Sequence, residues 1–146
     1  MLTRENSMSA QANRQLIESI FEHLATGDGA KFVQHLADNV VMRVTGQYSW
    51  SRTFNGKAAL MRDLYGYLRE VTQGTRKTIP LNIIADDQHV VVEARGDMTS
   101  RTGEPYRNEY CLVFKLQADR IVEMREYQDS TLCERVLGRY PKPRVE

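Results

Sequence analysis

The sequence has few of the features that mark specialised classes of protein. Its 146 residues include only two cysteines, Cys111 and Cys133, which are too few for a disulfide framework. No Cys and His residues have the spacing of zinc ligands, so we expect no metal site. We expect both cysteines to be reduced, buried thiols, because free cysteine commonly behaves as a small hydrophobic residue.

Long apolar runs and blocks of one charge are also missing. Nowhere do eighteen apolar residues follow one another, and the N-terminal stretch MLTRENSMSAQ lacks the apolar segment of a signal peptide. Twenty basic and nineteen acidic side chains nearly balance, without the basic block that is typical of nucleic-acid or membrane-surface binders. We therefore expect a soluble, cytoplasmic protein whose partners include no nucleic acid and no membrane.

What is present is typical of one globular domain. The chain is 41% hydrophobic, and a chain of this length buries roughly 68–70% of the surface that it exposes when unfolded. It contains no repeats, no low-complexity segments and no linker that would divide it. We predict a single domain over residues 1–146, with a core at about 9–138 and flexible ends at 1–8 and 139–146.

The first half of the chain predicts helices. Ser9 is a plausible N-cap, and Gly27 stands where a helix C-terminus favours glycine. Between them, apolar residues recur with helical period at Leu16, Ile17, Ile20, Phe21 and Leu24. We expect a second, short helix at about 29–36, a strand at about 40–44, and a third helix introduced by Asn55 and Gly56.

The second half predicts strands at roughly 76–86, 89–101, 106–117 and 120–129, separated by turn-like stretches. A last short helix should run from Ser130 or Thr131 to Leu137 and end at Gly138. This order predicts an α+β fold, in which N-terminal helices pack on a strongly curved, mostly antiparallel sheet to give a cone.

One stretch, EARGDM at 93–98, places Arg95 and Asp97 on the same face of a predicted strand. Two-residue loops at 102–103 and 118–119 would bring further polar residues to that face, with these pairings: Asp97 with Asn108, Arg95 with Tyr110, Asn108 with Asp129, and Tyr110 with Tyr127. A loop of odd length would reverse the faces. Such a row either lines a pocket or is solvated, and we interpret it as the polar end of a pocket.

The opposite face of the same strand is apolar. It carries Val90, Val92, Ala94, Gly96 and Met98. An apolar strand face has to be shielded from water by other protein surface, and two-fold dimers are the commonest assemblies of identical chains. We therefore expect this face to be the subunit interface of a homodimer.

The order of elements, with the segment GEPYRNEYCLVFKLQADRIVEMREYQD near the end, resembles the SnoaL-like branch of the nuclear transport factor 2-like superfamily. This superfamily of cone-shaped domains includes polyketide cyclases, ketosteroid isomerases and limonene epoxide hydrolase. The resemblance covers about residues 9–138 and implies a pocket for a small organic ligand. It specifies the fold more strongly than the function, because the fold hosts enzymes, binding domains and transport factors.

Part of the sequence is similar to limonene epoxide hydrolase. The RGD stretch at 95–97 resembles the Arg-x-Asp of that enzyme, and Asp129 in REYQD resembles its second catalytic aspartate. The resemblance implies that Asp97 is the acid, Asp129 the base and Arg95 the bridge between them. The residues that hold the water in that enzyme are replaced by Met42 and Val44, and the general base of ketosteroid isomerases would also fall at Val44.

Two functions follow from these observations. The first is a cofactor-free acid–base enzyme (a hydrolase, isomerase or cyclase) acting on a small, largely apolar substrate, with the catalytic residues Arg95, Asp97 and Asp129 and the substrate-binding residues Asn108, Tyr110 and Tyr127. The alternative is a non-catalytic ligand-binding or protein-interaction domain. A carboxylate with a perturbed pKa would favour the enzyme, and a pocket in which every charge is paired would favour binding alone. We expect no cofactor, because NGKAAL at 55–60 lacks the pattern of a phosphate loop.

Overall fold

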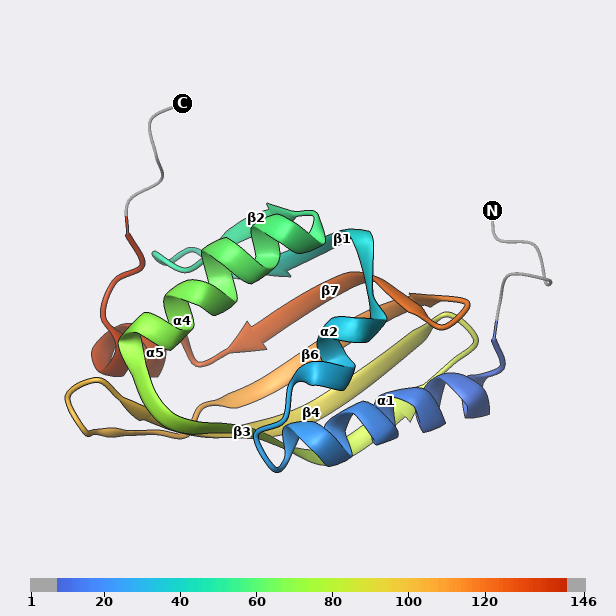
Figure 1. Ribbon diagram of the computed structural model, residues 1–146, viewed down its shortest axis with the longest axis horizontal. Helices are drawn as coiled ribbons and strands as arrows, with labels where there is room; N and C mark the ends of the chain where they lie inside the picture. The colour runs from blue at the N-terminus through green and yellow to red at the C-terminus, as the bar shows by residue number, and fades with distance from the viewer. Residues whose placement is uncertain (1–7, 142–146) are drawn as a thin grey trace.

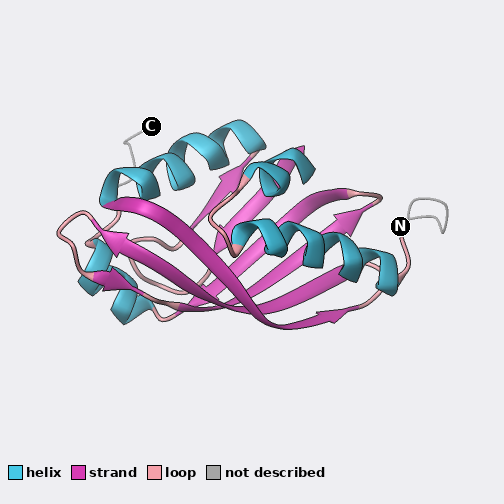
Figure 2. Ribbon diagram, turned by 60° about the horizontal axis from the view of Figure 1, so that its bottom comes forward, coloured by secondary structure: helices cyan, strands magenta, loops and turns pink. Residues whose placement is uncertain are grey.

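The computed structural model describes residues 8–141. Its helical segments are α1 (Ala10–Leu24), α2 (Ala30–His35), α3 (Lys57–Ala59), the π-helical segment η2 (Leu60–Tyr65), α4 (Gly66–Val71) and α5 (Ser130–Leu137). Its strands are β1 (Leu36–Val44), β2 (Arg52–Asn55), β3 (Thr72–Ala85), β4 (His89–Ser100), β5 (Pro105–Tyr106), β6 (Glu109–Gln117) and β7 (Arg120–Gln128). Helices α1, α2 and α4 lie over one face of a curved sheet (Figures 1 and 2).

The sheet is mixed. Its strand order is β2-β1-β7-β6-β4-β3, with β5 paired to β4. Neighbouring strands are antiparallel except β1 and β7, which run parallel and join the first half of the chain to the last strand. The long strand β3 changes register twice against β4, and such bulges bend a strand. The predicted α+β cone with a mostly antiparallel sheet is therefore confirmed.

Helix α1 forms as its sequence pattern predicts. The Ser9 side chain accepts a hydrogen bond from the amide of Ala12 at 3.0 Å, which satisfies one of the free amides of the first turn. After the helix, Gly27 has a φ of +90°, and a Cβ at this position would collide with the side chain of Thr75 on β3. Glycine is therefore required twice over at this turn, by its backbone conformation and by the close approach of β3.

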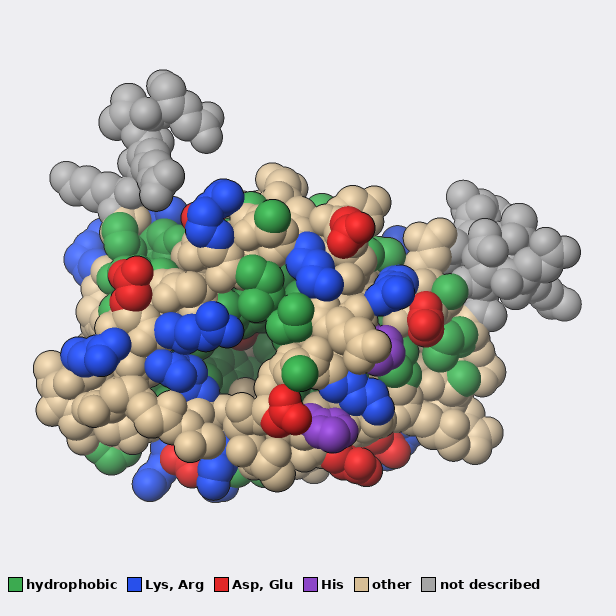
Figure 3. All heavy atoms as spheres, in the orientation of Figure 1, with side chains coloured by type: hydrophobic (Ala, Val, Ile, Leu, Met, Phe, Trp, Pro, Cys, Tyr) green, Lys and Arg blue, Asp and Glu red, His purple; other side chains and the backbone are tan. Residues whose placement is uncertain are grey.

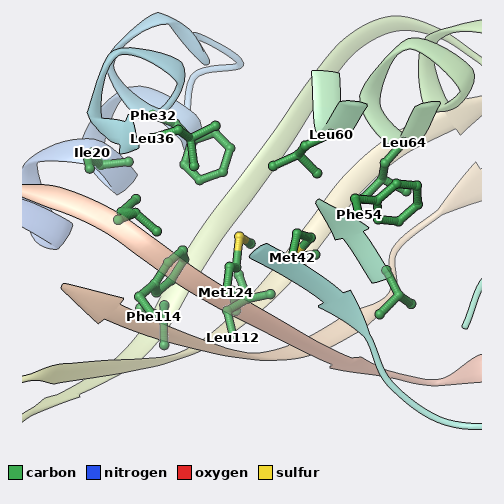
Figure 4. Close-up of a cluster of buried hydrophobic side chains, with 14 of the residues drawn as sticks. Ile20, Phe32, Leu36, Met42, Phe54, Leu60, Leu64, Leu112, Phe114 and Met124 are labelled. Atoms are coloured by element: carbon green, nitrogen blue, oxygen red, sulfur yellow. The ribbon is translucent and has the colours of Figure 1, made fainter. Parts of the chain in front are cut away.

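The core lies between the helices and the concave face of the sheet. Figure 4 shows side chains of the sheet pointing toward those of the helices and their flanking segments: Met42, Leu112, Phe114 and Met124 meet Ile20, Phe32, Leu36, Leu60 and Leu64. All of these side chains are buried. Removal of this apolar surface from water is the main source of stability of such a layered domain.

The apolar face of β4 is interior, which corrects the predicted subunit interface. Val90 and Val92 are 0% exposed, and Ala94 and Met98 are nearly as buried within the single chain. This face is the concave one, and the chain covers it with its own helices. A homodimer stays a prediction, but this face cannot be its contact surface.

The C-terminal helix α5 begins and ends as predicted. Its N-cap is Asp129, whose carboxylate accepts a hydrogen bond from the amide of Leu132 at 3.1 Å, and its C-cap is Gly138. Packing continues beyond the predicted core limit, because the Tyr140 ring lies 5.0 Å from that of Trp50 and its hydroxyl donates to the carbonyl of Asp63. Most of the predicted flexible ends lie outside the described residues.

The two cysteines are unpaired. Cys133 is buried, as predicted, whereas Cys111 is only half-buried on β6. Burial raises the pKa of the Cys133 thiol to about 12, so this side chain stays a neutral thiol.

Candidate active site

A cavity of about 370 Å³ lies between the helices and the concave face of the sheet, and Figure 3 shows the hollow by which it opens. Its volume falls within the range usual for sites that bind small molecules. Most of the lining is apolar and includes Phe21, Phe32, Trp50, Leu64, Leu68, Met98, Leu112, Phe114, Met124 and Leu137. The polar side chains in the lining include Tyr65, Tyr110, Glu126 and Gln128, together with Arg69 and Arg76.

Glu126 is the acidic side chain of this lining. It lies on β7 between Met124 and Gln128, which face the same cavity. Burial raises the pKa of the Glu126 carboxyl from 4.5 to about 7. Within residues 8–141 the carboxylate has neither a hydrogen-bond donor nor a cationic partner that would favour its charged form. Glu126 can therefore both accept and release a proton near neutral pH.

Two tyrosines lie near this carboxylate. Tyr65 ends the π-helical segment η2, and Tyr110 lies on β6 beside β7. Burial, followed by the negative charge of Glu126, raises the pKa of both hydroxyls well above the ordinary range. Both hydroxyls therefore remain protonated and can donate hydrogen bonds to a ligand. A π-helical turn is uncommon and frequently marks a functional site.

Gly96 makes room for the Tyr110 ring. A Cβ at position 96 would lie 3.0 Å from Cε2 of Tyr110 and 3.2 Å from its hydroxyl oxygen. Glycine therefore lets the ring lie directly against the backbone of β4, at a place where the concave face would otherwise carry a side chain.

A hydrogen-bonded network that includes two lining residues, Tyr106 and Gln128, holds the end of the sheet. The Asn108 amide donates to the Tyr106 hydroxyl at 2.8 Å and to the Asp129 carbonyl at 2.9 Å, and it accepts from the Asp129 amide at 3.1 Å. The Tyr106 hydroxyl donates to Gln128 Oε1 at 3.1 Å, and Gln128 Nε2 donates to the Tyr48 hydroxyl at 2.6 Å. Asn108 is 0% exposed, and both the nitrogen and the oxygen of its side-chain amide make hydrogen bonds. It therefore positions Gln128 and the start of α5.

The predicted catalytic residues do not meet in the cavity. Arg95 is exposed on the outer face of β4, and the Asp97 carboxylate lies 3.5 Å from Nε of Arg107, also outside. The Asp129 carboxylate caps α5, and Tyr127 is 45% exposed. Of the predicted residues, only Tyr110 lines the cavity. The predicted juxtaposition of Arg95, Asp97 and Asp129 is therefore wrong.

Two local features explain this error. The loop between β4 and β5 has three residues, 101–103, because the Ser100 amide bonds to the Glu104 carbonyl, and Gly103 takes a φ of +91°. Tyr110 therefore lies opposite Ala94 and not Arg95. Because the odd loop shifts the pairing by one residue, Tyr110 shares the apolar, concave face of β4 and not the face of Arg95 and Asp97.

The second feature is a bulge in β7. The predicted two-residue loop at 118–119 is present, since Gln117 pairs with Arg120. The register then shifts near Val122, so that Lys115 pairs with Glu123 and Tyr110 with Gln128. One extra residue turns Glu126 and Gln128 inward and leaves Tyr127 outside.

Sequence reasoning missed Glu126, although a signal for it existed. Ile121 and Met124 are apolar, lie three residues apart and are both buried. Residues on one face of a regular strand are separated by even numbers, so an odd spacing between two core residues indicates a bulge. A strand that restarts at Met124 places Glu126 and Gln128 on the inner face.

Over residues 8–141, no group of three or more His, Cys, Asp or Glu side chains could hold a metal ion. In the same part of the chain, no helix is both long and apolar enough to cross a membrane.

Comparison with known proteins agrees with the fold. No curated protein matches the chain. Among solved structures, a protein designated a SnoaL-like polyketide cyclase from Jannaschia sp. CCS1 superposes with a TM-score of 0.73 at 13% identity, covering 95% of this chain and 100% of that one. A protein designated an isomerase from Bacillus subtilis gives 0.67 at 18% identity, with 92% and 100% covered. An NTF2-like protein from Burkholderia pseudomallei gives 0.74 at 17% identity, with 89% and 98% covered.

These structures share the cone fold predicted from the sequence. The similarity to limonene epoxide hydrolase stays a prediction. The model of the SnoaL-like domain matches residues 17–124, which is most of the sequence, and so the chain belongs to the SnoaL-like family.

Proposed function

We propose that the cavity binds a small, largely apolar organic molecule and that Glu126 transfers a proton on it without a cofactor, in an isomerisation or a cyclisation. The observation that carries this proposal is the unpaired Glu126 carboxyl, whose pKa is raised to about 7 in an otherwise apolar cavity. A general base is most effective when its pKa lies near the working pH. Designations of two structurally similar proteins as a cyclase and an isomerase support the same reaction class.

The proposed reaction begins at a carbon next to a carbonyl group of the substrate. The C–H bond breaks, the proton passes to a carboxylate oxygen of Glu126, and the electron pair moves onto the carbonyl oxygen. Tyr110 or Tyr65 donates a hydrogen bond to the oxygen as its negative charge develops. In an isomerisation, Glu126 returns the proton to a different carbon, and the carbon–carbon double bond shifts. In a cyclisation, the carbanion adds to a second carbonyl carbon of the same molecule, the π bond of that carbonyl breaks, and its oxygen takes the proton back from Glu126.

The alternative, a domain that only binds its ligand, is less well supported. Such a pocket has no need for an ionisable group without a partner, because burying one costs free energy. Glu126 is such a group, whereas Tyr106 and Gln128 in the same lining are hydrogen-bonded to other side chains. A role in proton transfer would explain why the chain keeps Glu126 in the cavity despite the free energy that its burial costs.

Proton exchange tests the proposal before the substrate is known. The protein is incubated in deuterated water with a panel of apolar cyclic ketones and enones, and incorporation of deuterium next to the carbonyl is followed by NMR. We expect the protein to accelerate exchange for some members. Glu126→Gln should lower this rate by about 100-fold or more, since general base catalysis contributes about 10²–10⁴-fold.

Asp97→Asn is the matched control, because it removes a carboxylate from the outer face of the sheet. It should leave the exchange rate unchanged. The proposal is wrong if Glu126→Gln exchanges deuterium as fast as the natural protein, or if no member of the panel exchanges faster than in buffer.

A further inference from the structure

Three arginines gather where α4 ends and β3 begins. Arg69 and Arg76 line the cavity, and Arg101, which follows β4, reaches the same turn. Figure 3 shows Lys and Arg side chains gathered beside the hollow, over the junction of α4 and β3. The opening of an apolar cavity therefore carries concentrated positive charge.

The backbone at this turn holds two of these arginines in place. Arg76 Nε donates to the Thr72 hydroxyl at 2.5 Å, its Nη1 donates to the Gly74 carbonyl at 3.3 Å, and its Nη2 donates to the carbonyls of Arg69 and Thr72, each at 3.2 Å. Arg101 Nε donates to the Glu70 carbonyl at 3.0 Å, and its Nη2 donates to the same Arg69 carbonyl at 3.1 Å. These contacts satisfy the last carbonyls of α4 and orient the guanidinium groups, but carbonyl groups do not neutralise their charge.

No carboxylate balances the cluster. Other arginines of the surface form ion pairs, such as Arg135 with Glu104 at 2.8 Å, whereas within residues 8–141 none of the three has an acidic partner within 4.0 Å. Burial, followed by the charges of Arg69 and Arg101, lowers the pKa of Arg76. Three like charges without a counter-charge are unfavourable, and a bound anion would relieve their repulsion.

Capping of α4 accounts for Arg76 and Arg101 but not for Arg69. The guanidinium group of Arg69 has no hydrogen-bond or ion-pair partner in the described part of the chain, although the residue lines the cavity. A planar guanidinium matches the two oxygens of a carboxylate, so Arg69, beside the opening and the positive charge of Arg76, is well suited to bind one.

We infer that the substrate is a carboxylic acid with an apolar body, which fills the cavity while the carboxylate binds Arg69 and is attracted by the positive charge of Arg76. This inference rests on the proposed function, since it names the substrate class of the same cavity. It also orients the substrate: the carboxylate stays at the arginines, and the reactive carbon reaches Glu126. A carboxylate next to Glu126 would oppose formation of the charged base, whereas one at the opening leaves the base free to act.

A pair of fluorescent probes tests the inference. 4-(1-Pyrenyl)butanoate and 4-(1-pyrenyl)butan-1-ol share one apolar body and differ in the carboxylate, and fluorescence anisotropy reports the binding of each. We expect the acid to bind more tightly than the alcohol. Arg69→Gln should weaken binding of the acid by about fivefold, as expected for one exposed ion pair, and leave the alcohol unchanged. Added salt should weaken binding of the acid more strongly in the natural protein than in the Arg69→Gln variant.

Two control variants complete the design. Arg69→Lys keeps the charge and should recover most of the affinity for the acid, and Arg95→Gln removes an arginine from the outer face and should change neither probe. Equal binding of acid and alcohol, both unaffected by Arg69→Gln, would overturn the inference and leave the apolar cavity as a binding site. If neither probe binds, the inference fails too, while deuterium exchange tests the role of Glu126 separately.

Discussion

Two acidic residues show how position on the sheet decides what a carboxyl group can do. Asp97 lies on the outer face, 3.5 Å from Arg107, with its side chain 42% exposed. Glu126 lies on the concave face, where burial raises its pKa to about 7. A pKa near neutral suits Glu126 to proton transfer. Both residues stand on strands of one sheet, so the difference in their surroundings arises from the face of the strand on which each lies.

Burial of Glu126 should make the stability of the protein depend on pH. Its folded-state pKa of about 7 lies above the ordinary 4.5, so between these values the folded chain keeps a proton that the unfolded chain has released. The free energy of unfolding should therefore fall as the pH rises through this window, and it should stay low above it. Glu126→Gln removes this loss, so it should be more stable than the natural protein at about pH 8, by up to about 3 kcal/mol.

Urea unfolding at about pH 4, 6 and 8 measures this effect. The two proteins should converge at the lowest pH. Asp97→Asn, which changes an exposed carboxylate, should shift stability by no more than about 0.5 kcal/mol. A Glu126→Gln variant that is less stable than the natural protein at about pH 8 would show that the carboxylate is stabilised by its surroundings.

Gly96 and Tyr110 should be energetically coupled. Gly96→Ala places a methyl group about 3 Å from the Tyr110 ring, and overpacking of this kind costs about 1–3 kcal/mol. In a Tyr110→Leu background the same substitution should cost much less, because the ring is gone. A double-mutant cycle of urea unfolding measures the coupling. Equal costs in the two backgrounds would show that Gly96 is required for another reason.

Among the structural elements, the helices and most of the strands could be predicted from the sequence, although β1 and β3 each begin about four residues earlier than predicted. The faces of the last strands could not be predicted. Helical period and capping residues act locally, so Ser9 and Gly138 marked helix boundaries correctly. The face of a strand depends on the exact count of residues in the loops and bulges before it. One extra loop residue at 101–103 and one extra residue near Val122 reversed the predicted pairings.

The same distinction explains the site. Tyr110 lines the cavity as predicted, although its predicted pairing with Arg95 was wrong, because it alternates with the buried Leu112 and Phe114 along β6. Glu126 was missed because it follows the bulge, and the arginines at the opening were missed because α4 and β3 meet only in the folded chain. The alternation of residues along a strand therefore predicted the apolar wall of the cavity better than it predicted the charged groups of the cavity.

The hairpin between β6 and β7 contains a strained residue. Ala118 has a φ of +54°, the left-handed conformation that glycine adopts readily. Ala118→Gly should therefore stabilise the protein by about 0.5–1 kcal/mol, after allowing for the greater entropy of glycine in the unfolded chain. Ala58→Gly, at an exposed position of α3, should instead destabilise it by about 1 kcal/mol. Thermal or urea unfolding of both variants checks the sign, and a loss of stability in Ala118→Gly would contradict the strain.

Taken as a whole molecule, the protein is a curved sheet whose concave face is divided between a packed core and a ligand cavity. The cavity carries positive charge at its opening and an acid on its sheet wall, so an amphipathic substrate would enter in one orientation. A homodimer remains our prediction for the assembly, and sedimentation velocity at micromolar concentration would contradict it by giving the mass of one chain. Its contact surface must lie elsewhere than the Val90 face, which is interior.

The proposed proton transfer depends above all on the proton affinity of Glu126. NMR of protein carrying ¹³C-labelled glutamate follows each carboxyl carbon through a pH titration, and the signal that disappears in Glu126→Gln identifies this residue. The structure predicts a midpoint near 7 for that signal. A midpoint near the ordinary 4.5 would show that Glu126 is fully charged at neutral pH and solvated like a surface carboxylate, and the proposed proton transfer in the cavity would then be wrong.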